Sequence, residues 1–78
     1  MADIATRVKG ILIEKLGLEE AAITDQASFS NDLGVDSLDK IETFVELEKQ
    51  FSIRIPDEDA EKLTTVGSLI NYIIEHKN

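Results

Sequence analysis

Residues 33–39, where an aperiodic segment meets an amphipathic one, read Leu33-Gly34-Val35-Asp36-Ser37-Leu38-Asp39. Asp36 or Ser37 is suited to cap a helix that begins here, because either side chain can accept a hydrogen bond from a free backbone N–H group. The first turn of a helix has unpaired N–H groups and a positive dipole end, which hold a phosphate ester well. Ser37 is therefore a candidate attachment point, although the same serine could serve only as the cap.

Before this junction, apolar residues recur every three or four positions and predict a helix over residues 3–16. This stripe consists of Ile4, Val8, Ile11, Leu12 and Leu16. Gly17 can end the helix by adopting a left-handed conformation. Residues 18–35 lack periodicity and are rich in turn-forming residues, with Phe29 and Leu33 as the expected anchors to a core. A loop of this length in a compact domain is more often functional than accidental.

After the junction, three further helices are predicted. The first runs from residue 37 to residue 50 or 51, and Pro56 prevents its continuation. Pro56 and the acids that follow it favour a short helix that reaches about Leu63. Thr64 or Thr65 caps the last helix, whose apolar stripe is Val66, Leu69, Ile70, Ile73 and Ile74. The predicted fold is therefore all-α, with three longer helices and a short third one.

The composition favours a small cytoplasmic protein that binds other proteins. The 78 residues predict a single domain, 1–78, with little room for a buried catalytic cleft, which argues against an enzyme. The chain has no Cys, so it cannot form disulfides or thiolate metal sites, and a reducing compartment suits it. No apolar run approaches the roughly 20 residues that span a bilayer, and no signal peptide is recognisable. The net charge of −8 repels nucleic acid and anionic lipid and attracts basic protein surfaces.

The helix predicted for residues 37–51 has more apolar positions than one core contact requires. These positions form two stripes roughly 100° apart around the helix. The core stripe is Phe44, Leu47 and Phe51, and the exposed stripe is Leu38, Ile41 and Val45, bordered by Asp39, Glu42, Glu46 and Glu48. An exposed apolar strip with an acidic border is typical of a docking surface for basic proteins. The alternative is a solvated helix with stray hydrophobic residues, and periodicity alone leaves both open.

Other candidate sites are weaker. The only histidine, His76, is expected to be a solvated residue of a frayed C-terminal end, so no activated serine nucleophile is indicated. Asp57-Glu58-Asp59 lacks the ligand order of a calcium loop and indicates a solvated helix start with loose ion binding. No specific metal site is therefore assigned.

The motif Leu-Gly-X-Asp-Ser-Leu at residues 33–38 is accompanied by further short motifs along essentially the whole chain. These are Arg7-Val8-Lys9, Ala27-Ser28-Phe29, Glu42, Leu47-Glu48, Phe51, Ile55-Pro56-Asp57, Leu63-Thr64-Thr65-Val66 and Tyr72-Ile73. The set resembles the acyl carrier proteins of bacterial type II fatty acid synthesis, a family of phosphopantetheine-binding carriers. The core motif is specific where the rest of the chain aligns and weak when it stands alone.

This resemblance implies a four-helix bundle with a long loop between its first two helices and a 4′-phosphopantetheine arm on Ser37. A phosphopantetheinyl transferase would move the arm from coenzyme A to the serine hydroxyl with the assistance of Mg²⁺. The terminal thiol of the arm would then hold growing acyl chains as thioesters, while the carrier itself catalyses nothing. A monomer without stable membrane insertion is expected.

The resemblance also implies two kinds of partner for the acidic face. The transferase would contact Asp36 and Asp39. Fatty acid synthesis enzymes and acyltransferases with basic docking surfaces would bind the same face in turn. The expected partner-binding residues are Asp36, Leu38, Asp39, Ile41, Glu42, Val45, Glu46, Glu48 and Asp57.

Three residues depart from the usual pattern of this family. Lys40 stands where a small or β-branched residue is common, and it could pair with Asp36 or approach the phosphate of the arm. Thr43 occupies a position usually given to Leu on the side expected to face the acyl chain, and Phe44 is bulkier than the common aliphatic residue. These departures raise the alternative of a specialised carrier for aminoacyl, polyketide or lipid-linked acyl groups. An unmodified acidic helical adaptor is a second alternative.

Overall fold

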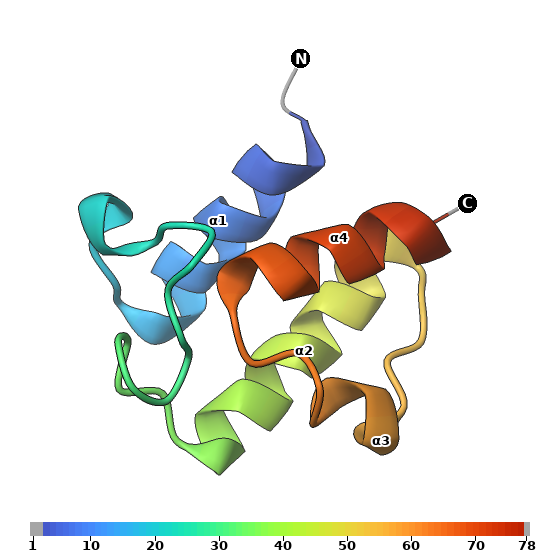
Figure 1. Cartoon of the computed structure of the whole chain (residues 1–78). Coiled ribbons are helices and arrows are strands. Elements are labelled where there is room, and N and C mark those ends of the chain that lie inside the picture. The colour runs from blue at the N-terminus through green and yellow to red at the C-terminus, as the bar shows by residue number, and fades with distance from the viewer. Residues whose placement is uncertain (1–2, 78) are drawn as a thin grey trace.

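The computed structural model describes residues 3–77 and consists of helices joined by loops (Figure 1). The α-helices in this range are Ile4–Leu16 (α1), Ser37–Phe51 (α2), Asp57–Ala60 (α3) and Val66–His76 (α4), and a 3₁₀ turn covers Glu20–Ala22 (η1). Three longer helices and a short third one confirm the predicted all-α fold. In Figure 1 the loop between α1 and α2 lies to the left of the bundle, and α3 lies to the right.

Helix α1 begins at Ile4, one residue later than predicted, and ends at Leu16 as predicted. The Asp3 carboxylate accepts a hydrogen bond from the Thr6 backbone N–H at 2.8 Å and caps the first turn. At the other end Gly17 has a φ of 67°, and its N–H donates to the Ile13 carbonyl. This left-handed cap costs glycine nothing, because it has no Cβ to clash. The helix packs against α2 and α4 and buries Val8 completely.

Helix α4 begins with a capping box. The Thr65 hydroxyl accepts from the Ser68 N–H at 3.2 Å, and the Ser68 hydroxyl accepts from the Thr65 N–H at 3.1 Å. The predicted stripe is buried at Val66, Leu69, Ile70 and Ile73. The prediction that Ile74 belongs to this stripe is wrong, because its side chain is 49% exposed. It follows Ile73 by one residue and so lies beyond the edge of the stripe that contacts the core.

Backbone hydrogen bonds anchor the long α1–α2 loop to the start of α4. Ser28 and Thr65 form an isolated antiparallel bridge, and the Val66 N–H donates to the Ala27 carbonyl at 3.1 Å. Phe29, which the sequence predicts as an anchor, is 2% exposed and meets Phe44 edge-to-face with ring centroids 5.9 Å apart. The second predicted anchor, Leu33, is only partly buried.

Helix α3 is shorter than predicted, because it ends at Ala60 rather than at Leu63. The N–H groups of Lys62 and Leu63 donate to carbonyls three residues back, so the chain tightens into turns instead of continuing as an α-helix. This turn directs Leu63 into the core, where it is 7% exposed, and returns the backbone to the extended conformation that Thr65 needs as a cap. Tertiary burial thus decides where α3 stops.

The core lies where α1, α2 and α4 face one another. Its most enclosed side chains include Leu12, Leu47, Leu69 and Ile73, one or two from each of these helices. Burial of one such side chain contributes about 1.5–3 kcal/mol. The core-facing stripe predicted for α2 is buried, since Phe44 and Phe51 are 5% and 9% exposed. Within residues 3–77, no helix combines the length and apolar character that crossing a membrane requires.

Candidate functional site

The helix cap and the candidate attachment residue are two neighbouring side chains. Asp36 has extended backbone angles, and its carboxylate accepts a hydrogen bond from the Asp39 N–H at 2.8 Å, so Asp36 is the cap of α2. Ser37 is the first residue of α2, and its side chain is exposed. Within residues 3–77 the Ser37 hydroxyl makes no hydrogen bond. The alternative in which Ser37 serves only as the cap is therefore wrong, and its hydroxyl is left accessible to a modifying enzyme.

The turn before α2 sets the direction of this helix. Gly34 has a φ of 65°, a left-handed conformation that glycine adopts without strain. The next residue, Val35, is 8% exposed, and its N–H donates to the Phe29 carbonyl at 2.7 Å. The turn is thus fixed to the anchored loop on one side and to the cap at Asp36 on the other. Ser37 is held at the surface by this arrangement.

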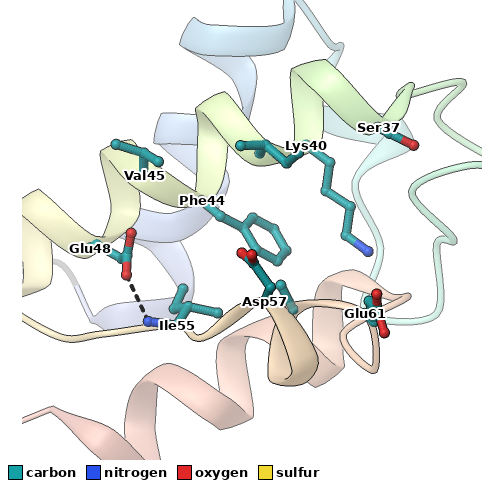
Figure 2. Close-up of a pocket in the computed structure, with 10 residues that line it drawn as sticks. Ser37, Lys40, Phe44, Val45, Glu48, Ile55, Asp57 and Glu61 are labelled. Carbon is teal, nitrogen blue, oxygen red and sulfur yellow. Dashed lines mark hydrogen bonds between the residues drawn. The ribbon is translucent and has the colours of Figure 1, made fainter.

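A pocket of about 370 Å³ opens beside Ser37, between α2 on one side and α3 with the segment before it on the other (Figure 2). Its walls are largely apolar. The lining residues are Ser37, Lys40, Ile41, Phe44, Val45, Glu48, Ile55, Asp57, Ala60 and Glu61. A Glu48 carboxylate oxygen accepts a hydrogen bond from the Ile55 N–H at 2.8 Å, which ties the segment after α2 back onto the helix. This contact fixes the end of the pocket farthest from Ser37, as Figure 2 shows.

Lys40 occupies the pocket in a way that the sequence does not indicate. Its Nζ lies 5.5 Å from the ring centroid of Phe44 and 5.9 Å from that of Phe29. Burial lowers the pKa of the Lys40 ammonium, and the nearby Glu61 carboxylate opposes this shift. The predicted pairing with Asp36 is wrong, because the one ion pair within residues 3–77 joins Lys9 and Asp25. The aromatic rings hold the side chain between α2 and α3 instead.

Thr43 does not face the pocket, so that expectation from the sequence is also wrong. The side chain is 2% exposed, lies in the interior of the bundle and is not part of the pocket wall. Its hydroxyl donates to the Asp39 carbonyl at 2.8 Å, one turn earlier in α2, which satisfies its only buried polar group. Phe44, the next residue, does line the pocket.

The predicted exposed stripe of α2 is on the surface. Leu38, Ile41 and Val45 are 64%, 59% and 43% exposed. Apolar side chains of this size rarely gather on the surface of a small domain without a function. The stripe is therefore a candidate docking surface, and Ile41 and Val45 also form one lip of the pocket.

The acidic residues predicted to bind partners fall into two groups. Asp36, Asp39, Glu42 and Asp57 are exposed, whereas Glu46 and Glu48 are half-buried. Glu46 accepts a hydrogen bond from the Gln50 amide at 2.9 Å, which lowers its pKa, and it lies in a shallow groove beside Lys15 of α1. Glu48 is engaged with the Ile55 N–H. The four exposed acids are thus the ones that a partner can reach, and one of them, Asp36, also caps α2.

Three residues of the pocket are not predicted as site residues from the sequence: Ile55, Ala60 and Glu61. They follow α2 in a segment without periodicity and reach the site only through the turn at Pro56 and the short helix α3. Pro56 is the one signal of that reversal. A sequence pattern predicts that such a turn exists, but it does not predict which side chains the turn brings opposite α2.

Within the described part of the chain, no three His, Cys, Asp or Glu side chains are grouped so that they could hold a metal ion. His76 is not frayed, because it is the last residue of α4 and its ring stacks on that of Tyr72 with centroids 3.9 Å apart. It is exposed, as expected.

Comparisons with known proteins match the fold and identify the family of this chain. The family described as "Phosphopantetheine attachment site" matches residues 6–73 of this chain, and the chain belongs to that phosphopantetheine-binding family. Among solved structures, an acyl carrier protein from Enterococcus faecalis is similar, with 36% sequence identity and a TM-score of 0.81. The match covers 95% of this chain and 94% of that one. The resemblance to acyl carrier proteins that the sequence predicts is thereby confirmed.

Membership of this family implies a covalently attached 4′-phosphopantetheine group. The residues of this structure suit such a group. Ser37 offers an exposed hydroxyl, the first turn of α2 offers backbone N–H groups and a positive dipole end, and an apolar pocket lies beside them. Acyl carrier proteins transport their cargo and do not act as catalysts on it.

Proposed function

We propose that this protein carries acyl groups as thioesters on a 4′-phosphopantetheine arm attached to Ser37, and that it delivers them to the enzymes of fatty acid synthesis. The observation that carries the proposal is the accessible Ser37 hydroxyl, which is relieved of capping by Asp36 and stands at the mouth of an apolar pocket. The family match and the similar acyl carrier protein support the same function.

Each part of the site has a physical function in this proposal. The Ser37 oxygen forms the phosphodiester link, and the dipole of α2 favours the negative charge that this link introduces. The bound arm supplies a terminal thiol, which forms thioesters with acyl groups. Ile41, Phe44, Val45 and Ile55 form the apolar part of the pocket wall beside the attachment point, and Lys40 places a charge in the same wall. No side chain is needed for catalysis.

The partners follow from the chemistry of the α2 surface. Leu38, Ile41 and Val45 supply apolar area, and the exposed carboxylates of Asp36, Asp39, Glu42 and Asp57 attract basic surfaces on a phosphopantetheinyl transferase and on synthesis enzymes. Such exposed charge contacts are weak individually, which allows successive partners to exchange. We place the protein in the cytoplasm, as a monomer that binds one enzyme at a time.

The decisive test is intact-protein mass spectrometry after incubation with coenzyme A, Mg²⁺ and a phosphopantetheinyl transferase. The wild-type chain should gain the mass of one phosphopantetheine group, and Ser37→Ala should fold and gain none. Ser30→Ala, a change at an exposed loop serine, is the matched control and should be modified like wild type. An unchanged mass for wild type would favour the acidic adaptor, and an arm found on another serine would refute the assignment of Ser37.

The cargo is tested on protein purified from its native host. A mixture of saturated and 3-oxo acyl thioesters on the arm would support fatty acid synthesis. Aminoacyl or polyketide groups on the same arm would instead identify a specialised carrier.

A further inference from the structure

Among residues 3–77, Lys40 is the one cation in the wall of the pocket beside Ser37. It lies on α2 three residues after Ser37, and Figure 2 shows its side chain extending from α2 into the space in front of α3. The side chain is half-buried, with its Nζ within 6 Å of the ring centroids of Phe44 and Phe29. The ammonium group therefore takes up part of the space that an apolar cargo would use.

The charge environment of this ammonium makes it costly to bury further. Of the carboxylates in the pocket wall, Glu48 is engaged with the Ile55 N–H, and neither Asp57 nor Glu61 lies within the 4.0 Å of an ion pair with Lys40 in the described chain. Water reaching in from the open side of the pocket must provide the remaining hydrogen bonds of the ammonium. An alkyl chain that filled the pocket would remove this water and offer no acceptor in return.

The remaining route for an alkyl chain is to displace Lys40 into solvent. The side chain would then lose its contacts with the faces of Phe29 and Phe44, which stabilise a cation. The favourable free energy of burial increases with the length of the alkyl chain, but the loss of these contacts offsets part of it. Short acyl groups, which need not enter the pocket, incur no such loss.

Resting on the function proposed above, we infer that Lys40 is a specificity-determining residue that excludes long alkyl chains from the pocket, so that only short acyl groups are carried without either exposing alkyl surface to water or displacing Lys40. Its charge is the determining property, because a neutral side chain of similar length can line the pocket without needing water. Phe44 and Ile55 would then be free to contact the alkyl chain in a neutral variant.

The experiment compares acetyl and octanoyl forms of the whole protein, loaded from the corresponding acyl-coenzyme A by a phosphopantetheinyl transferase. Octanoyl adds only methylene groups to acetyl, so the difference in unfolding temperature between the two forms reports burial of the alkyl chain. For wild type we expect the octanoyl form to unfold within about 1 °C of the acetyl form. For Lys40→Met the octanoyl form should unfold at least about 4 °C higher than the acetyl form.

Two further variants separate charge from other effects. Lys40→Arg retains the cation and should behave like wild type. Lys49→Met removes an exposed lysine from the same helix, outside the pocket, and should also behave like wild type. Cleavage of the thioester by hydroxylamine gives a second readout: the octanoyl ester of Lys40→Met should be cleaved several-fold more slowly than that of wild type, with equal rates for the acetyl esters.

The outcomes are distinguishable. The inference is overturned if the octanoyl group raises the unfolding temperature of wild type as much as that of Lys40→Met. A large rise in Lys40→Arg overturns it as well. If Lys40→Met does not fold, the acetyl and octanoyl forms of wild type still decide. An octanoyl form that unfolds more than about 4 °C above the acetyl form overturns the inference, and equal unfolding temperatures support it. Absence of any arm in the mass spectrum overturns the proposed function and this inference with it. An arm present without the expected effect of Lys40 overturns this inference alone.

Discussion

At the scale of single residues, the site depends on a division of tasks between Asp36 and Ser37. Asp36 satisfies the free N–H of Asp39, which a serine hydroxyl in the same place would otherwise have done. Ser37 can then present its oxygen outward from the first turn of α2. Two adjacent residues that could each have capped the helix thus acquire different functions through their backbone positions.

A second position where one residue matters is Gly67, which allows the α1–α2 loop to approach α4. The Gly67 N–H donates to the Asp25 carbonyl at 2.8 Å, and a Cβ on Gly67 would lie 2.8 Å from that same oxygen. Gly67→Ala must therefore shift backbone atoms, and we expect it to lower the free energy of unfolding by about 1–3 kcal/mol in urea denaturation.

Gly10→Ala is the matched control for this prediction. Gly10 lies in the exposed part of α1, with no atom within 4 Å of an added Cβ. Alanine should raise the free energy of unfolding there by about 0.5–1 kcal/mol, because it has the higher helix propensity. Equal effects of the two substitutions would show that the loop does not press on α4 at Gly67.

At the scale of elements, α3 is a four-residue helix that cannot be stable alone, and it is held by side chains from its neighbours. The Tyr72 hydroxyl of α4 donates to the Asp59 carboxylate at 2.8 Å. On the other side, the Glu48 carboxylate of α2 holds the Ile55 N–H in the segment before α3. Because α3 forms one wall of the pocket, these two contacts set its width.

Tyr72→Phe tests the contact between α4 and α3. Removal of the hydroxyl should lower the free energy of unfolding by about 1 kcal/mol at neutral pH. Burial and the hydrogen bond to Asp59 raise the pKa of Tyr72 to about 12, so the folded state favours the protonated phenol. The stability difference between wild type and variant should be constant up to about pH 10 and should shrink as the pH rises through about 12. A difference that does not change over this range would show that the hydroxyl does not donate to Asp59.

The outer face of α2 is the element on which partner binding depends in our proposal. Glu42→Lys reverses an exposed charge next to Ile41 and should leave the helical content seen by circular dichroism unchanged. Turnover of the acylated carrier by a ketoacyl synthase should fall by about tenfold or more at low salt, because attraction to a basic surface becomes repulsion. Glu75→Lys, the same charge reversal at an exposed residue of α4, is the control and should change this turnover little. Equal turnover by both variants would exclude this face as the docking surface.

At the scale of the whole molecule, the net charge of −8 is largely uncompensated. In the described part of the chain a single ion pair occurs, between Lys9 and Asp25 at 3.6 Å, and both side chains are partly or largely exposed. The one basic residue of the pocket, Lys40, faces aromatic rings instead of carboxylates. The acidic face around α2 and α3 therefore repels itself, and this repulsion acts against the compact state.

Screening of this repulsion should stabilise the fold. We expect the unfolding temperature at neutral pH to rise by about 4–8 °C between low salt and about 0.5 M NaCl, which corresponds to roughly 1 kcal/mol for a domain of this size. Mg²⁺ should act more strongly than Na⁺ at equal ionic strength. Differential scanning calorimetry measures both series, and a flat or falling response would show that the basic residues already neutralise the acidic surface.

Local patterns in the sequence predict most of the fold and part of the site. The spacing of apolar residues gives α1, α2 and α4, because a helix faces its core with the same periodicity wherever it stands in the chain. The caps at Gly17 and Thr65 and the attachment candidate Ser37 are equally local, since each acts within one turn. The predicted end of α3 at about Leu63 is wrong, because the end at Ala60 is set by the burial of Leu63 against distant residues.

The tertiary structure alone decides which side chains meet across the pocket. Ile55, Ala60 and Glu61 come opposite α2 through a turn whose geometry depends on the Glu48 and Tyr72 contacts. Lys40 turns toward Phe29 and Phe44 rather than Asp36, and Thr43 turns inward, because the packing of several elements determines these environments. The sequence by itself thus determined the helices, their caps and the serine at the start of α2, all of which depend on neighbours within a turn. The composition of the pocket depends on contacts between residues far apart in the chain, and only the folded structure brings those residues together.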